Sequence, residues 1–248
     1  MKRSNANRNL ISYSVWSFSI ICWFILLFNP GNLLTAAHCQ MNLCNRSSAS
    51  LKMILKINPF SEMMTGWILM VLAMMLPKLI IPIQIIINQS FKSMSFLLVI
   101  LFITGYVLMW AVTGFLLNIF IIFVSIQMPG SFILAVIFGI ITLIWQFSPI
   151  KQKCLNRGHY HPVLAAWGSK AYKDAFSFGI THGFWCVGAG WALMLLPMLL
   201  PQGHHLAMLI ATFIMLSEHM EHPQAPRWRI DLRLKLLRII IPENPIGR

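Results

Sequence analysis

Residues 95–126 read SFLLVILFITGYVLMWAVTGFLLNIFIIFVSI, a long stretch without a charged side chain. About 20 apolar residues in a helix cross the hydrocarbon core of a bilayer, so this stretch predicts a transmembrane helix long enough to tilt. Over the whole chain 58% of residues are hydrophobic and 10% are charged, whereas a soluble domain carries about 25% charged residues. The sequence therefore predicts an all-α membrane protein with the lipid bilayer as its main partner.

Further apolar stretches complete a predicted bundle of about six spans. The predicted spans are residues 11–28, 62–88, 95–126, 131–147, 174–200 and 204–220. Pro77 and Pro82 predict a kink in the second span, because proline lacks a backbone donor and clashes with the preceding turn. The connections are predicted to be an outer loop at 29–58, a basic inner loop at 148–173 and an amphipathic tail at 226–241 that lies on the membrane face.

The charge distribution predicts the orientation of the bundle. A net charge of +13 arises from 19 Lys and Arg against 6 Asp and Glu. The basic residues flank the apolar spans instead of forming one continuous patch, which argues against nucleic acid as a partner. Only Arg46, Lys52 and Lys56 fall on the side of the outer loop. Because basic loops stay in the cytoplasm, both termini are predicted to be cytoplasmic.

Common enzyme motifs are absent from the sequence. It contains no glycine-rich phosphate loop, no G-x-S-x-G elbow and no His-Glu-x-x-His helix. Paired carboxylates for acid–base work inside the membrane are also missing. Hydrolase and kinase chemistry is therefore not expected.

The second span offers a first candidate for a metal site. Met70 and Met74 are four residues apart, so they share one helix face, and Met75 follows directly. Their thioethers are soft ligands that suit a cuprous ion. Methionine is also an adaptable packing residue, so a purely structural role is the alternative.

The fifth span offers the strongest candidate for a buried site. His182 and Cys186 lie four residues apart, so one helix face presents an imidazole and a thiol, and Met194 continues roughly along that face. The alternative is close helix packing through neighbouring glycines such as Gly179 and Gly183. An ionisable residue at membrane depth nevertheless favours a functional role.

The end of the sixth span offers a third candidate. Glu218 and His222 are one helical turn apart, and His219 pairs with His222 at a spacing of three. This spacing suits a metal or proton exchange at the cytoplasmic mouth. The alternative is that polar residues simply end the helix before Pro223.

The outer segments offer a possible capture site. Four soft or borderline ligands lie in the first outer loop, namely His38, Cys39, Met41 and Cys44. Cys39 and Cys44 are alternatively able to form a disulfide in an oxidising compartment. His204 and His205 are predicted to lie on the same side of the membrane.

Several motifs follow one another in a distinctive order. They are Trp67-x-x-Met70-x-x-Ala73-Met74-Met75-x-Pro77, Gly105-Tyr106-x-x-x-Trp110, Gln146-x-Ser148-Pro149-x-Lys151-x-x-Cys154-Leu155, His182-Gly183-x-x-Cys186-x-Gly188-x-x-Trp191-Ala192-Leu193-Met194 and Glu218. Over residues 63–218 they resemble the bacterial family of predicted metal-binding integral membrane proteins, domain of unknown function 2182. The resemblance implies a multi-helix protein of the bacterial inner membrane with a role in metal handling.

The chain departs from this family in the fifth span. The family commonly has Cys-x-Gly-Cys-Cys-Trp, whereas this chain has Cys186-Val187-Gly188-Ala189-Gly190-Trp191. Two thiols are missing, so a metal site here must rely on His182, Cys186 and methionines.

Three functional hypotheses follow from the sequence. The leading one is an integral membrane protein that binds or transfers a soft transition metal, with copper favoured over zinc, in metal handling or metalloenzyme maturation. Its partner would then be a metalloprotein client. The second is a structural or assembly subunit of a larger membrane complex. The third is a carrier of protons or small solutes that uses Lys78, His182 and Glu218.

Overall fold

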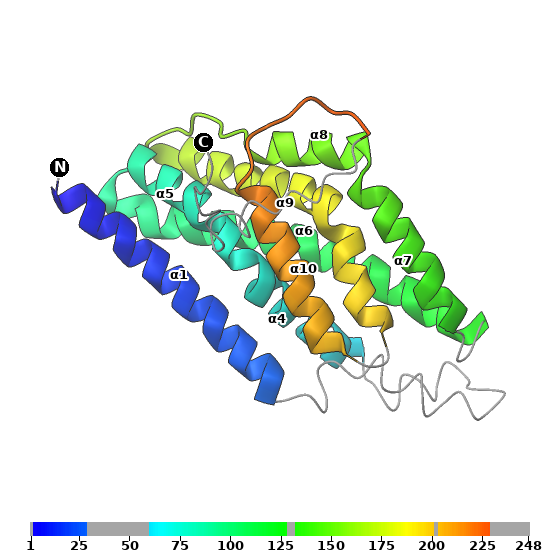
Figure 1. The fold of residues 1–248 in the computed structure, drawn as a ribbon. Coiled ribbons are helices and arrows are strands. Elements are labelled where there is room, and N and C mark those ends of the chain that lie inside the picture. The colour runs from blue at the N-terminus through cyan, green and yellow to red at the C-terminus, as the bar shows by residue number, and fades with distance from the viewer. Residues whose placement is uncertain (1, 29–59, 128–131, 201–202, 229–248) are drawn as a thin grey trace, which may run out of the picture.

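The computed structural model describes residues 2–28, 60–127, 132–200 and 203–228, and no β-strand occurs within those ranges. The helices form one bundle (Figure 1). In chain order they are α1 (Lys2–Phe28), α4 (Phe60–Met75), the 3-10 helix η1 (Leu76–Leu79), α5 (Ile80–Gln89), α6 (Lys92–Gln127), α7 (Phe132–Gln146), α8 (Pro149–Gly158), α9 (Gly168–Leu199) and α10 (His204–His219). The predicted all-α class is confirmed.

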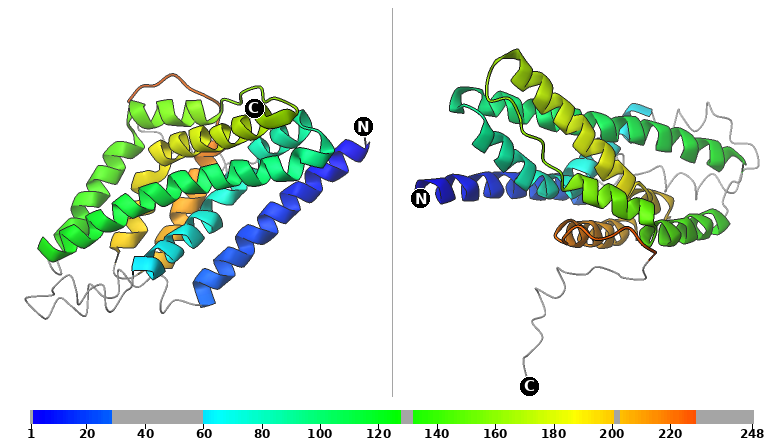
Figure 2. Two further views of the ribbon diagram at one scale, coloured as in Figure 1. Left: turned by 180° about the vertical axis from the view of Figure 1, so that it is seen from behind. Right: turned by 90° about the horizontal axis from the view of Figure 1, so that it is seen from above.

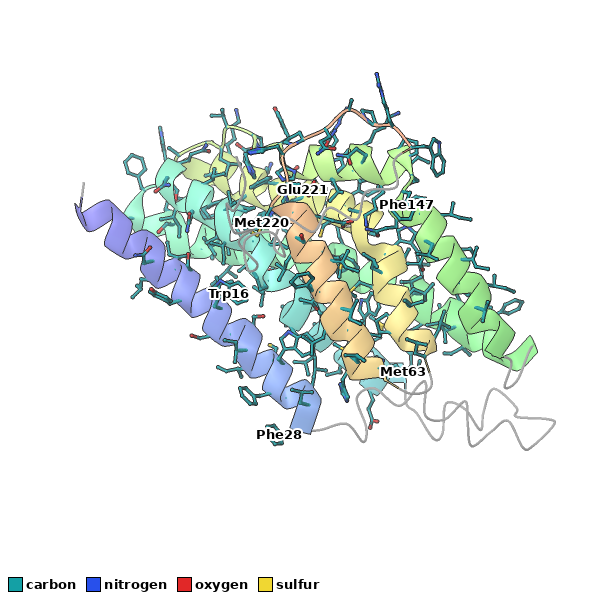
Figure 3. All side chains as sticks on the ribbon, viewed as in Figure 1. Trp16, Phe28, Met63, Phe147, Met220 and Glu221 are labelled. Carbon is teal, nitrogen blue, oxygen red and sulfur yellow. The ribbon has the colours of Figure 1, made fainter. Side chains whose placement is uncertain are left out.

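Several helices have the length and composition of membrane spans. Four segments are long and apolar enough to cross a membrane, namely Asn9–Phe28, Phe60–Gln89, Lys92–Val124 and Gly168–Leu199. α7 and α10 are shorter than these four segments. Large apolar side chains point outward along the bundle, as at the end of α1, where Phe28 is 77% exposed (Figure 3). Such a surface suits lipid better than water.

α1 packs antiparallel to α4 and α5. Near the middle of the pair, Ser19 Oγ donates a hydrogen bond to the Ala73 carbonyl at 2.6 Å. Closer to the start of α1, Gln84 Nε2 donates to Ser12 Oγ at 3.2 Å. The regular α-helix gives way to the 3-10 turn η1 between these two contacts, where Pro77 predicts a kink.

α6 and α9 run parallel and form the most extensive helix contact of the described residues (Figure 2). Phe102 faces Gly179, and one turn later Tyr106 faces Gly183. A side chain at Gly105 would lie 2.7 Å from a carbonyl oxygen of α9. The backbones therefore meet because glycine occupies the crossing points.

α7 lies antiparallel to α9 on the other side. Trp145 Nε1 donates to the Gly188 carbonyl at 3.1 Å, and Thr142 Oγ1 donates to the Ala192 carbonyl at 3.3 Å. α8 then crosses the end of the bundle and packs on α9. α10 follows α9 along the chain, and its N-cap residue Gly203 has φ of +76°.

The segment 148–173 differs from the expected basic loop. Ser148 caps α8 by accepting a hydrogen bond from the Lys151 backbone N–H at 3.1 Å, and Pro149 occupies the first turn. α9 also begins earlier than predicted, at Gly168 rather than at residue 174. The Ser-Pro pair is a helix-start signal that the charge-based interpretation of this segment overlooked. The loop is reduced to residues 159–167.

Two predicted segments lie wholly or mostly outside the described residues. The outer loop 29–58 lies outside the described residues. The tail 226–241 falls mostly outside them too, because the description ends at residue 228.

Candidate metal centre

A stripe of soft donor atoms runs along α9 and the helices packed against it. His182, Cys186, Gly190 and Met194 follow one another in steps of four residues, or about 6 Å of helix each. His182 is 5% exposed, Met194 is fully buried and Cys186 is half-buried. We call these positions, together with the methionines beside Gly190, the donor stripe.

Aromatic rings surround His182 on the donor stripe. The ring centroids of Phe102, Tyr106 and Phe178 lie 6.0, 6.0 and 5.8 Å from that of His182. Within the described ranges the imidazole makes no hydrogen bond. Its ring nitrogens are not among the fully enclosed polar atoms that lack a partner, so they remain accessible to water or to a metal.

Cys186 lies one turn further along α9. Its Sγ is 3.1 Å from the Tyr106 hydroxyl on α6. If Cys186 is a thiolate, its sulfur accepts a hydrogen bond from the Tyr106 hydroxyl. The Tyr106 hydroxyl is therefore placed to stabilise the form of cysteine that ligates metals.

Two methionines meet α9 at Gly190. A carbon in the Cβ position of Gly190 would lie 3.2 Å from Met215 Sδ and 3.5 Å from the Met75 methyl carbon. Met75 comes from α4 and Met215 from α10, so two helices bring thioethers to α9 at this point. Met70 and Met74 are buried in the same core.

Met215 was not among the sequence candidates. Met208 and Met215 are seven residues apart on α10 and are both buried, which is the repeat of one helix face. This spacing was readable in the sequence, but which helix that face contacts was not.

Cys154 belongs to a helix contact, away from the donor stripe. On α8 it packs against Gly188, where an added Cβ would lie 2.7 Å from its sulfur. Burial raises the pKa of the Cys154 thiol, so it favours the protonated form, which is a poor metal ligand.

Glu218 is committed to an ion pair. Its carboxylate accepts from Lys151 Nζ at 2.8 Å, with the two side chains only 3% and 2% exposed. The Gln146 amide also donates to Glu218 and accepts from Lys151 at 2.5 Å. This triad ties together α7, α8 and α10.

His219 and His222 are separated by the end of α10. The helix ends at His219, so the regular spacing that would bring His222 onto the same face does not continue, and His222 is exposed. The His219 ring stacks on that of His159 at 5.2 Å. His159 Nε2 also contacts the His219 carbonyl at 3.0 Å, and its Nδ1 contacts the Leu155 carbonyl at 2.8 Å.

The remaining candidates lie elsewhere. His38, Cys39, Met41 and Cys44 fall outside the described residues. His204 Nδ1 contacts the Pro197 carbonyl at 2.7 Å, at the junction of α9 and α10. Within the described ranges, no three or more His, Cys, Asp or Glu side chains form a metal-binding group. A metal site of three or more side chains within those ranges must therefore include methionine sulfur.

A comparison with known families bears directly on this chemistry. The PpoB2 family, described as a copper chaperone, matches residues 64–231. The chain belongs to this copper chaperone family. The matched range runs from α4 to beyond the end of α10, so the PpoB2 match includes the whole donor stripe and the Lys151–Glu218 pair.

The PpoB2 match confirms a copper-related family, in line with the metal role that the motif resemblance implied. It does not carry the name domain of unknown function 2182. No curated protein and no solved structure matches the chain.

Proposed function

We propose that this chain is a membrane copper chaperone that takes Cu(I) into its helix bundle and passes it to a metalloprotein client. The single observation that carries the proposal is the donor stripe, on which His182, Cys186 and the methionines beside Gly190 follow one another inside the bundle. Membership of a copper chaperone family supports it.

Cu(I) suits the donor stripe better than other metals. Thiolate, thioether and imidazole ligands favour Cu(I), whereas the hard cations Mg²⁺ and Ca²⁺ require oxygen ligands. Acidic side chains are absent from the stripe. A Cys186 thiolate would neutralise the charge of the ion in this apolar interior. Copper is therefore the expected cargo and zinc the second choice.

The spacing of the donors supports movement of the ion along the stripe. Steps of about 6 Å between successive levels are short enough for a flexible methionine side chain to contact the ion before the previous ligand releases it. Each exchange then keeps copper ligated by soft atoms. We infer that copper moves between His182 and Met194 by such exchanges.

The arrangement of helices supports a bundle of six crossings with both termini in the cytoplasm. α1, the α4–α5 pair, α6, α7, α9 and α10 alternate in direction along the chain. α8 and the loop 159–167 then lie at the same end as the start of α1, where the basic residues concentrate. The bacterial inner membrane is the compartment that we propose.

The alternative functions receive less support from the contacts. Gly179 and Gly183 face α6 of the same chain, so they do not provide a packing surface for another subunit. Glu218 is paired with Lys151, so its carboxylate is not available as a lone proton carrier. On the donor stripe, Cys186 contacts the Tyr106 hydroxyl, a hydrogen bond that leaves the sulfur able to ligate a metal.

Copper titration of the purified protein tests the proposal. The protein in detergent would be titrated anaerobically with Cu(I) in competition with a chromophoric chelator. We expect tight binding that weakens at least about tenfold, or about 1.4 kcal/mol, in His182→Ala/Cys186→Ala. Removing both groups deletes an imidazole and a thiol from the stripe.

Cys22→Ala/His222→Ala is the matched control, since it also removes one thiol and one imidazole but away from the donor stripe. Its Cu(I) affinity should equal that of the unmodified chain. Equal Cu(I) affinity of the unmodified chain and His182→Ala/Cys186→Ala, both eluting as folded species, would refute the proposed site.

A further inference from the structure

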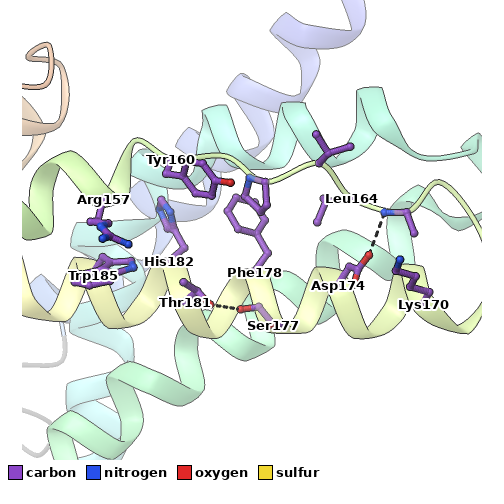
Figure 4. A pocket seen from close by; sticks show the side chains of 13 residues that line it. Arg157, Tyr160, Leu164, Lys170, Asp174, Ser177, Phe178, Thr181, His182 and Trp185 are labelled. Atoms are coloured by element: carbon purple, nitrogen blue, oxygen red, sulfur yellow. Dashed lines mark hydrogen bonds between the residues drawn. The ribbon is translucent and has the colours of Figure 1, made fainter.

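A groove lies between the loop 159–167 and α9 (Figure 4). Its volume is about 660 Å³, within the range of about 300–1,000 Å³ typical of small-molecule sites. One wall is a face of α9 on which Lys170, Asp174, Ser177, Thr181 and Trp185 follow one another at helical spacing. The backbone and side chains of the loop form the other wall.

His182 connects this groove to the donor stripe. The imidazole rises from α9 between Phe178 and Trp185 and lines the groove (Figure 4). Of the residues that line the groove, only His182 also belongs to the donor stripe. A ligand in the groove would meet His182 before any other copper donor of the stripe.

The charges of the groove favour an anion. Arg157 and Lys170 line it, and the Arg157 guanidinium is held over the Trp185 ring at 5.4 Å. The groove also contains Asp174, whose carboxylate accepts a hydrogen bond from the Ala165 backbone N–H at 3.1 Å. The two cations outnumber this single carboxylate, so the groove favours an anionic complex over a free Cu⁺ ion.

We propose that the groove is the port at which copper enters the donor stripe, and that it receives Cu(I) as a small anionic thiolate complex. This inference rests on the proposed function. The groove holds the complex between Arg157 and Lys170 and presents its copper to His182. The hydroxyl groups of Ser177 and Thr181 lie on the same wall.

The transfer is a ligand exchange without a redox step. In the incoming complex two thiolates bind Cu(I), which gives a single negative charge. The His182 nitrogen lone pair forms a new bond to copper, and one thiolate leaves. The Cys186 sulfur displaces the second thiolate, which takes the Cys186 proton. Copper remains Cu(I), one thiol and one thiolate are released, and the negative charge leaves with the thiolate.

Loading rates from two complexes of opposite charge test the port. The full-length protein in detergent would receive Cu(I) either from glutathione, which gives an anionic complex, or from cysteamine, which gives a cationic one. We expect Arg157→Gln/Lys170→Gln to slow loading from glutathione by about tenfold. Loading from cysteamine should not slow, and it therefore shows that the variant is folded.

Lys153→Gln/Lys173→Gln is the matched control. It removes the same charge from exposed positions of α8 and α9 that do not line the groove. Its loading rate from glutathione should be unchanged. Equal slowing of both double variants, or no slowing of either, would overturn the port. A complete lack of copper uptake from both complexes by the unmodified protein would instead refute the proposed function.

Discussion

Two regions of the bundle contain comparable ligand atoms but differ in how these atoms are paired. At the end of α10, Lys151 and Gln146 bind the Glu218 carboxylate, and His159 contacts His219. Along α9, His182 is about as buried as Glu218, yet it makes no hydrogen bond within the described ranges. The first region is held by internal contacts, whereas the second leaves ligand atoms available.

This difference distinguishes a structural cluster from the proposed binding site. A buried polar group is stable only when it has a partner. The Lys151–Glu218 pair has its partners inside the chain, so it stabilises the fold. The His182 imidazole has no hydrogen-bond partner within the described residues, and its ring nitrogens are not fully enclosed, so a ligand can reach them. The predictions below test this distinction, beginning with the largest expected change in free energy.

Glu218→Gln should cause the largest loss of stability. It leaves the Lys151 ammonium buried without its counter-charge, which costs about 3–5 kcal/mol. We expect a clear fall in Tm with no change in Cu(I) affinity. Glu62→Gln, at a half-exposed position of α4, removes the same charge and should leave Tm almost unchanged. Loss of copper binding in folded Glu218→Gln would contradict the proposal that Glu218 is structural and that only the donor stripe binds copper.

Gly190→Cys should strengthen copper binding. The new thiol would lie beside Met75 and Met215, at the point where an added Cβ is 3.2 Å from Met215 Sδ. A thiolate is a stronger ligand for Cu(I) than a thioether, so we expect Cu(I) affinity to rise at least about tenfold, or 1.4 kcal/mol. Gly139→Cys on α7, where no atom lies near an added Cβ, should leave the affinity unchanged.

Met75→Leu/Met215→Leu should weaken copper binding by a smaller factor. Leucine keeps most of the packing volume but removes both thioethers, so stability should change by less than about 1.5 kcal/mol for each substitution. We expect a several-fold loss of Cu(I) affinity in the chelator competition. Met63→Leu/Met208→Leu changes the same two helices at positions two to three turns away. If both double variants bind copper equally, the thioethers beside Gly190 are packing residues only.

His161 should give the smallest effect, through pH. Burial, with a further contribution from the nearby His159, lowers the pKa of His161. Below the ordinary histidine pKa of about 6.5, His161 therefore takes up a proton in the unfolded chain more readily than in the folded chain. The free energy of unfolding then decreases as the pH is lowered. His161→Asn should lose less Tm between pH 7.5 and 5.5 than the unmodified protein. His222→Asn, at an exposed position, should show the same loss as the unmodified protein.

The sequence predicts the fold class because span length and apolar composition are local properties. Residues 95–126 lie within one continuous helix, α6. It did not predict α8, because the interpretation of 148–173 followed its charge and overlooked the Ser148-Pro149 start signal. The alternation of helix directions was implied by the span count, but the choice of α6 as the parallel neighbour of α9 depends on tertiary packing.

The candidate site was predictable only along single helices. His182, Cys186 and Met194 share a stripe because their spacing is a property of one helix. The meeting of Met75 with Met215 depends on how α4, α9 and α10 pack, which no local pattern encodes. The spacing between Glu218 and His222 was misleading for a related reason, since α10 ends at His219.

The glycine crossing of α6 and α9 also constrains how a metal can travel. Gly105, Gly179 and Gly183 bring backbone against backbone, and backbone atoms have no rotamers with which to yield. Sliding or rocking of one helix past the other would force these atoms into each other. On the proposed function, copper would therefore advance past a fixed backbone scaffold, and rotation of side chains alone would pass it from one ligand to the next.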